Sequence, residues 1–552
     1  MNKKLPFAAI AKPLLLTFLV SAPLTTLAQG SDIQINATNF PDLRFRSYLL
    51  TQDYGKDGVI TEEEIKGITE LEMPGKNIAT LEGIEHFTAL TKLNCYNNKL
   101  TELDLSSNTA LNYIQCGGNQ LTTLDLSSNT ALAKLLCGNN QLAELNVSKN
   151  TAMTYLYCSS NQLTALDLSG NTALDTLVCD RNQLTTIDVS GCAALINISC
   201  EVNQLAMLDV SKNMALASLS CYGNQLTTID ISKNPALAYL SCSGNPLTTL
   251  DVSGSTTLEG LNCTATQLTA LNVSGCTALT ALYCYSNQLT TLDVSGCPAL
   301  NTLSCSNNQL AALDLSKNTA LNTLDCSNNQ LTTIDVSGCA ALASFSCDVN
   351  QLAALDVSAC PQLVSVQCSN NQLTSLGLPE GTELITIYCS NNQLTTIDVS
   401  KCRVLVTLDC SNNQLTAIDV SNNPALRNLY CSRNQIKGTS MDALIDSLPQ
   451  TNKCFLYVYD DTEADEGNIC TKTQVATAKA KDWTPYKHDG YNRWVEYEGI
   501  DDDDPMGVAQ PTTAKASQES APVYTISGQK VAGGLNGRKG VYVVGGKKVI
   551  VK

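Results

Sequence analysis

The residues of this chain that could do chemistry are its cysteines, histidines, aspartates and serines, and most of them recur at one fixed interval. The 552 residues include 25 cysteines but only two histidines, His86 and His488. A cysteine stands at every twenty-first position from Cys95 to Cys431, which places 17 of the 25 in one uninterrupted column. A nucleophile or a metal site needs one local constellation, whereas a column indicates a repeated structural position.

Acid–base catalysis is not expected from these residues. The two histidines flank the repeated region, and about 18 stacked coils at about 4.8 Å each would separate them by about 85 Å. The aspartates and serines also recur in columns, which indicates a scaffold role rather than one activated group. We therefore predict that the protein is not an enzyme.

Aspartate occupies 13 of 16 positions in a second column, which runs from Asp104 to Asp419. A serine follows two residues after most of them, so we expect each carboxylate to accept a backbone N–H bond at a turn. The alternative is a calcium-binding ladder, because stacked carboxylates repel one another unless a cation neutralises them. The turn role is favoured.

The first 28 residues have the pattern of a secretory signal peptide. Lys3 and Lys4 precede an apolar run over residues 14–20, and Thr26-Leu27-Ala28 offers a cleavage site before Gln29. No later apolar segment approaches the length that spans a bilayer, and no cysteine follows the signal closely enough to indicate a lipid anchor. We therefore expect export.

The net charge of −17 argues against nucleic-acid binding, because a phosphate backbone attracts a basic face.

Cysteines in an exported chain usually indicate disulfide bonds. Here the 21-residue column instead favours buried thiols that act as small apolar side chains, because in-register neighbours on stacked strands suit disulfide torsions poorly. Only Cys454 and Cys470, which lie outside the columns, are a plausible disulfide pair. Six further cysteines stand eight residues before a column cysteine, where other copies have asparagine, and are expected to be structural: Cys192, Cys276, Cys297, Cys339, Cys360 and Cys402.

One 21-residue unit positions all these columns, and a clean copy is LNTLDCSNNQLTTIDVSGCAA at residues 321–341. Its first half reads L-x-x-L-x-C-x-x-N-x-L, the leucine-rich repeat pattern with cysteine in place of a leucine, and predicts one short strand and one tight turn. Asparagine follows the column cysteine by three residues in every copy except the one with Thr266. A copy of this length cannot bury its apolar face alone, so the copies must stack as a solenoid.

The sequence divides into six segments. These are a signal peptide (1–28), an N-terminal helical cap (29–67), the solenoid (68–448), a C-terminal α/β cap (449–500), a linker (501–522) and a C-terminal β segment (523–552). In the N-terminal cap, Asp53, Asp57 and Glu64 match positions one, five and twelve of a calcium-binding EF-hand loop, although Gly55 replaces the expected ligand at position three. The favoured alternative is a capping box between Thr61 and Glu64.

Tyrosine marks the predicted ligand-binding surface. All ten tyrosines of the regular repeats fall at the third, fifth or seventh place of the motif, which should face outward from the strands. Tyrosine supplies amphipathic contact area at low entropic cost. The alternative is that tyrosine merely suits an exposed strand of a structural spacer. Eight of the ten lie in the first ten coils and are the predicted site: Tyr96, Tyr113, Tyr155, Tyr157, Tyr222, Tyr239, Tyr283 and Tyr285.

The cysteine-containing 21-residue repeat resembles the internalin J type of bacterial leucine-rich repeat over residues 68–448. This resemblance implies a right-handed, curved α/β solenoid of about 18 coils, with a parallel β-sheet on its concave face and a buried cysteine ladder. It also implies an adhesin-like role in binding an extracellular protein or glycan. We expect a monomer, and no cofactor other than calcium at the EF-hand-like loop. The chain lacks an LPxTG signal, and its tail, with TISGQKV, KGVYVV and KKVIVK, resembles type IX secretion sorting segments. That implies the outer surface of a Gram-negative bacterium.

Overall fold

A computed structural model describes residues 32–380, 383–450, 452–462, 466–490 and 493–502, together with three strands near the C-terminus. These strands, β28 (Val523–Thr525), β29 (Gly540–Val544) and β30 (Lys547–Val551), pair antiparallel in that order. The predicted signal peptide and most of the predicted linker lie outside the described residues.

The chain forms two compact units. Unit 1 runs to Leu394 and includes Lys401–Val404, and unit 2 comprises Thr395–Ser400 and the chain from Leu405 onward.

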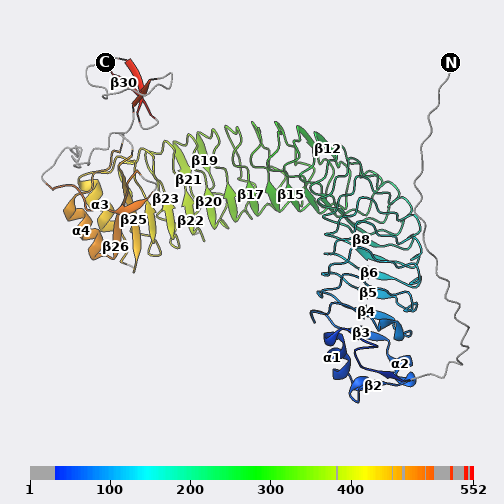
Figure 1. Cartoon of the computed structure of the whole chain (residues 1–552). Helices are drawn as coiled ribbons and strands as arrows, with labels where there is room; N and C mark the ends of the chain where they lie inside the picture. Colours follow the sequence, from blue (N-terminus) through cyan, green and yellow to red (C-terminus); the bar gives the residue numbers. More distant parts are fainter. Residues whose placement is uncertain are drawn as a thin grey trace, which may run out of the picture. The chain divides into compact units, whose positions relative to one another are not determined.

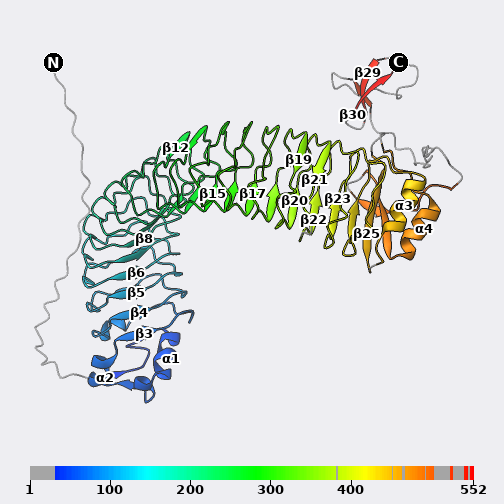
Figure 2. The same cartoon turned by 180° about the vertical axis from the view of Figure 1, so that it is seen from behind.

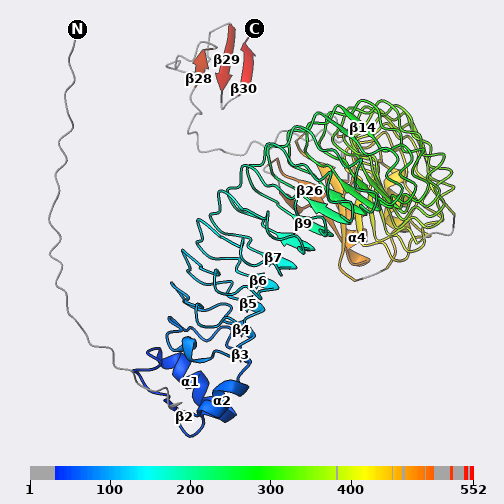
Figure 3. The same ribbon diagram turned by 90° about the vertical axis from the view of Figure 1, so that its right-hand side faces the viewer.

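Unit 1 begins with short elements that precede its first coil (Figure 3). They are β1 (Ile33–Gln34), α1 (Leu43–Thr51), the 3₁₀ turn η1 (Asp53–Gly55), β2 (Val59–Ile60) and α2 (Glu62–Gly67). Asp42 caps α1, because its carboxylate accepts the N–H groups of Arg44 and Phe45. It also accepts the N–H of Ala79, which ties the helix to the first coil. A second 3₁₀ turn, η2 (Ile84–His86), lies within that coil.

The coils of unit 1 each contribute one three-residue strand to a parallel sheet (Figures 1 and 2). The register shifts by one whole repeat per coil, so that Leu93 pairs with Ile114 and Ile114 with Leu135. The middle residue of each strand is buried, and so is the ladder cysteine that follows the strand. The strands are β3 (Glu70–Glu72), β4 (Lys92–Asn94), β5 (Tyr113–Gln115), β6 (Lys134–Leu136), β7 (Tyr155–Tyr157), β8 (Thr176–Val178), β9 (Asn197–Ser199), β10 (Ser218–Ser220), β11 (Tyr239–Ser241), β13 (Gly260–Asn262), β15 (Ala281–Tyr283), β16 (Thr302–Ser304), β17 (Thr323–Asp325), β18 (Ser344–Ser346), β20 (Ser365–Gln367) and β22 (Thr386–Tyr388).

The second half of each coil lies on the opposite side of the stack and is built mainly from turns (Figure 1). Two pairs of short parallel strands occur there: β12 (Thr249–Asp251) with β14 (Ala270–Asn272), and β19 (Ala354–Asp356) with β21 (Ser375–Gly377). The aspartate column lies on this side. The Asp104 carboxylate accepts the Ser106 N–H at 2.9 Å, which lowers the pKa of Asp104, and the same bond recurs along the column to Asp419. The predicted turn role of these aspartates is confirmed.

Unit 2 contains a parallel ladder of its own, from β23 (Thr407–Asp409) to β26 (Trp483–His488), together with the helices and the last strand of an α/β cap. Its other elements are β24 (Asn428–Tyr430), α3 (Thr439–Ser447), β25 (Cys454–Asp460), α4 (Lys472–Ala480) and β27 (Trp494–Glu496). The sequence did not predict β26, whose third residue is Pro485 and which pairs with β25 in parallel and with β27 antiparallel. Trp483 is fully buried, and its indole N–H donates to the Pro449 carbonyl, which anchors this strand.

The asparagine three residues after the ladder cysteine connects consecutive coils. The Asn224 amide donates to the carbonyls of Cys221 and, one coil earlier, Cys200, and its oxygen accepts the Leu205 N–H. These groups belong to the turn and are buried, so no water is available to satisfy them. A second internal column is formed by asparagine in some coils and cysteine in others, with Ser255 in one coil. Asn213 donates to the Val189 and Cys192 carbonyls, and the Cys192 thiol lies 3.6 Å from the Leu168 carbonyl.

All 25 cysteines lie within the described residues, are buried, and form no disulfide bond with one another. Burial raises the pKa of the ladder thiols, to about 12 for Cys116, so these side chains are neutral at physiological pH. The suggested pairing of Cys454 with Cys470 is therefore wrong for this structure. The Cys454 thiol is directed at the Leu426 carbonyl, whereas Cys470 is close enough to Cys431 to raise its pKa.

The second residue after each ladder cysteine adopts a left-handed backbone conformation, and valine occupies this position at Val202 and Val349. A β-branched residue is strained there, because its Cβ lies too close to the backbone. This conformation costs about 1–2 kcal/mol. Replacing Val202 by asparagine, which other coils use at Asn139 and Asn307, should raise the free energy of unfolding by about 1 kcal/mol. Urea denaturation checks this, and the reverse change Asn139→Val should cost a similar amount. A loss of stability in Val202→Asn would contradict the strain argument.

Candidate ligand-binding surface

The candidate site lies on the outward side of the parallel sheet in unit 1, which we call the sheet face. It comprises the first and third residue of each strand and the residue after the ladder cysteine. The first and third strand residues face away from the core, because the residue between them is buried and neighbouring side chains alternate along a strand. The residue after the cysteine is exposed where it is a tyrosine and buried at several serines. Serine, threonine, asparagine and glycine occupy most positions of the sheet face.

The eight predicted tyrosines all lie on the sheet face. Tyr113, Tyr155 and Tyr239 begin strands, whereas Tyr157 and Tyr283 end them. Tyr96, Tyr222 and Tyr285 each follow a ladder cysteine. None of the eight is buried, and the exposed fraction reaches 54% at Tyr239. Their position is as the motif predicts, and their role in binding stays a prediction.

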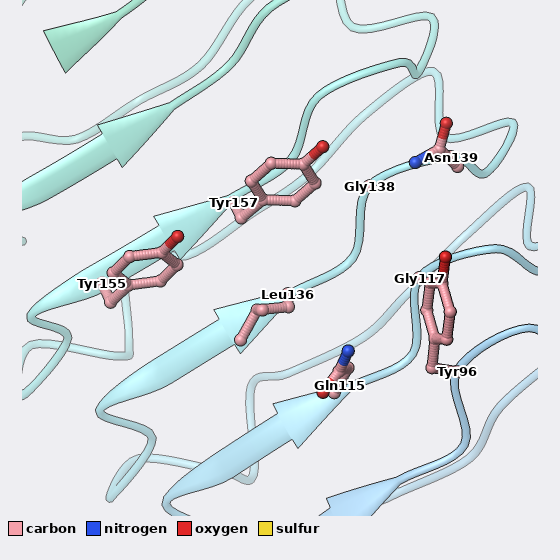
Figure 4. A pocket seen from close by; sticks show the side chains of 8 residues that line it. All are labelled: Tyr96, Gln115, Gly117, Leu136, Gly138, Asn139, Tyr155 and Tyr157. Carbon is pink, nitrogen blue, oxygen red and sulfur yellow. The ribbon is translucent and has the colours of Figure 1, made fainter. Parts of the chain in front are cut away.

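Three of these tyrosines surround a hollow of about 290 Å³, which we call hollow 1 (Figure 4). Tyr155 and Tyr157 project side by side from β7, and Tyr96 stands across from them, beyond Leu136 and Gln115. Gly117 and Gly138 leave this volume open because they have no side chain. A Cβ on Gly138 would lie 2.2 Å from the Tyr157 ring, so only glycine permits this ring position. The hollow is lined by Tyr96, Gln115, Gly117, Leu136, Gly138, Asn139, Tyr155 and Tyr157.

A second hollow, hollow 2, has a volume of about 400 Å³ and is built in the same way. A Cβ on Gly260 would lie 2.9 Å from the Tyr239 ring, which therefore rests over this glycine. The Tyr239 hydroxyl donates to the Glu259 carboxylate at 2.6 Å, which fixes the ring. The hollow is lined by Ser218, Leu219, Ser220, Tyr239, Leu240, Ser241, Gly260, Leu261, Asn262, Ala281 and Tyr283.

An acidic network lies on the sheet face between the two hollows. The Asp180 carboxylate accepts the Ser199 hydroxyl at 2.6 Å and the Glu201 N–H at 2.8 Å. The Glu201 carboxylate in turn accepts the Ser220 hydroxyl. Sequence reasoning missed this network, although Asp180 and Glu201 occupy the same motif place in consecutive coils. It separates the tyrosine surface into two parts.

The predicted calcium ligands of the EF-hand-like loop are engaged in other contacts. Asp53 is paired with Lys56, and the Asp57 carboxylate accepts the Val59 N–H. Glu64 accepts the Thr61 N–H in a capping box that starts α2. Within the described residues, no three His, Cys, Asp or Glu side chains are grouped so that they could hold a metal ion. Calcium binding at this loop stays a prediction.

Unit 2 carries an aromatic cluster of its own, whose arrangement the sequence did not predict. Tyr430 stacks on Tyr457 with 4.0 Å between ring centroids, and Trp494 packs edge-on against Tyr457 at 4.9 Å. Tyr486 lies on the other strand beside Tyr457, with centroids 5.5 Å apart. The cluster covers the strands that end the ladder, and a packing role accounts for it.

The stacked coils, the parallel sheet and the internal asparagine and cysteine ladders define a leucine-rich repeat protein. A solved structure of the functional domain of InlJ from Listeria monocytogenes, which includes a cysteine ladder, is 32% identical to this chain with a TM-score of 0.58. The match covers 73% of this chain and 82% of that domain. The chain belongs to the internalin J type of cysteine-ladder leucine-rich repeat proteins, which confirms the predicted solenoid and its buried thiol column.

Other comparisons are narrower. Internalin J of Listeria monocytogenes serotype 4b (strain F2365) is 39% identical over 85 residues, which are 15% of this chain and only 9% of that protein. YopM from Yersinia enterocolitica WA-314 shares the fold, with 24% identity and a TM-score of 0.55 over 71% of this chain and 88% of YopM. No family model matches the chain. Among the described residues, no helix combines the length and apolarity that crossing a membrane requires.

Proposed function

We propose that this protein is an exported cell-surface interaction protein that binds an extracellular protein or glycan through the tyrosines of its sheet face. The observation that carries the proposal is that tyrosines border two hollows on this face, while the later coils of unit 1 carry only Tyr388. Solenoid repeats offer extended binding surfaces of this kind, and exposed tyrosine provides rigid amphipathic contacts. The alternative, a structural spacer, gives no reason for such clustering.

Export and surface delivery are part of the same proposal. They rest on the signal-like segment 1–28 and on the tail at 523–552, which resembles type IX sorting segments. Deleting residues 523–552 should then shift the protein from the surface of Gram-negative cells to another fraction. Surface proteolysis followed by cell fractionation measures this, and unchanged surface exposure would refute the role of the tail.

The test of binding uses the mature chain from Gln29, incubated with arrays of extracellular-matrix proteins and glycans. A variant with Tyr155, Tyr157, Tyr283 and Tyr285 changed to serine should lose captured ligand by about tenfold or more, because aromatic anchors dominate interface energies. Tyr388→Ser is the matched control, since Tyr388 is also a half-buried sheet-face residue but lies outside both hollows. Equal binding by the parent and the fourfold variant would mean that the binding site lies elsewhere on the protein. If neither protein captured a ligand, the result would favour the alternative of a structural spacer.

A further inference from the structure

The two hollows share an electrostatic property, because no charged side chain lines either of them. The sequence contains 85 charged residues, from 34 Lys and Arg and 51 Asp and Glu, yet none of them lines hollow 1 or hollow 2. An anionic ligand would find no cationic partner among the lining residues, and burying an unpaired charge is costly. The carboxylates behind hollow 2, Glu259 and Glu201, already accept the Tyr239 and Ser220 hydroxyls. The lining therefore fits a neutral ligand.

Both hollows combine aromatic faces with short polar groups. Hollow 1 places the amides of Gln115 and Asn139 beside the three tyrosine rings, and hollow 2 places the Ser218 and Ser241 hydroxyls and the Asn262 amide beside Tyr239. A sugar ring presents an apolar C–H face and a rim of hydroxyl groups. The C–H face can stack on tyrosine, while the hydroxyl groups exchange hydrogen bonds with amides and serines. This combination complements a saccharide better than a charged peptide.

The spacing of the hollows favours a polymer. Hollow 1 is centred on the coil of Cys137 and hollow 2 on the coil of Cys242, which is five coils later. At about 4.8 Å per coil, the centres are about 24 Å apart along the sheet. Asp180 and Glu201 lie on the path between them and would repel a polyanion. A chain that reaches both hollows must therefore be long and uncharged along this path.

We propose that hollows 1 and 2 are two subsites for one linear neutral polysaccharide that runs along the sheet face across the strands. This inference rests on the proposed function and names the ligand class of the same surface. A short saccharide occupies one hollow at a time. A long chain occupies both and gains affinity, because the second contact is made within an already bound complex.

The experiment is isothermal titration calorimetry of the mature chain with soluble linear β-glucan, α-mannan and β-galactan and with the trisaccharide of each. One polymer should bind at least tenfold more tightly than its trisaccharide, and the trisaccharide should show two sites per chain. Tyr157→Ser in hollow 1 and Tyr239→Ser in hollow 2 should each leave one trisaccharide site and lower polymer affinity to the level of the trisaccharide. The double variant should bind neither.

Three controls keep the result interpretable. Tyr388→Ser should bind like the parent, and Tyr157→Phe should keep binding, because the ring rather than the hydroxyl provides stacking. Lys134→Ala should also bind like the parent, since Lys134 lies on the sheet face outside the lining of hollow 1. Thermal unfolding of each variant verifies its fold.

Several outcomes overturn the inference. Binding that weakens with salt or with Lys134→Ala would show an anionic ligand. The arrays could instead capture a protein that the fourfold tyrosine variant no longer binds, with no binding of any neutral glycan. This outcome would overturn the inference of a polysaccharide ligand and leave the proposed function intact. Failure of every probe, protein and glycan alike, would reject both.

Discussion

Replacing Asn224 by alanine is expected to lower the free energy of unfolding by about 3 kcal/mol or more, because an unsatisfied buried polar group costs about 1–3 kcal/mol. The side chain of Asn224 satisfies three buried backbone groups, namely the carbonyls of Cys200 and Cys221 and the N–H of Leu205. Alanine satisfies none of them. No solvent reaches this turn, since Asn224 and both cysteines are buried.

Urea denaturation followed by circular dichroism measures this loss of stability. Two further variants serve as comparisons. Gln225→Ala changes the exposed neighbour and should alter stability by less than about 0.5 kcal/mol. Thr266→Asn fills the one gap in the column, where the single hydroxyl proton of Thr266 has two acceptors within reach, the Cys263 carbonyl at 2.8 Å and the Asn287 amide oxygen at 3.0 Å. It should be neutral or stabilising. An Asn224→Ala variant as stable as the parent would show that the ladder is not a source of stability.

The repeat itself explains why so much of the fold was predictable from the sequence. Each coil repeats the same buried positions, so a buried position that is ambiguous in one copy can be assigned from the other copies. The strand, the turn and the buried cysteine all follow from this one motif. The helices at both ends were also predictable, because capping residues such as Thr61 and Glu64 mark them. Strand β26 was not, since Pro485 removes a backbone donor and argues against a strand.

The candidate site was predictable only in part. The motif places all eight predicted tyrosines on the sheet face, because outward positions follow from strand alternation. The hollows are different, since they depend on pairs in neighbouring coils: the Tyr157 ring fits only because Gly138, one coil earlier, has no side chain. The Asp180–Glu201 network likewise arises between coils. A motif read within one copy gives no information about these contacts, and the structure supplies them.

Raising the pH to about 10 is expected to unfold the solenoid, an effect larger than that of any single substitution. Burial raises the pKa of the ladder thiols to about 12 at Cys116, Cys158, Cys200 and Cys242, from the ordinary value of 9.0. A thiol with a raised folded pKa contributes its full stability below pH 9 and loses it as the pH rises, because only the unfolded chain ionises. At pH 10 each ladder thiol favours unfolding by roughly 1 kcal/mol. Repeated along the ladder, this destabilisation is of the same order as the roughly 5–15 kcal/mol by which domains are stable.

Circular dichroism and the thiolate absorbance, recorded together from pH 7 to pH 11, test this expectation. Loss of the β-signal and appearance of thiolate should coincide, because the thiols ionise only when the coils open. A variant with Cys200, Cys221 and Cys242 changed to alanine is the control. It should be less stable at pH 7 but lose roughly 3 kcal/mol less between pH 8 and pH 10, since it lacks three ionising groups. Thiolate that forms while the β-signal persists would mean that the ladder is open to solvent, and the buried thiol column would then have to be abandoned as the core of these coils.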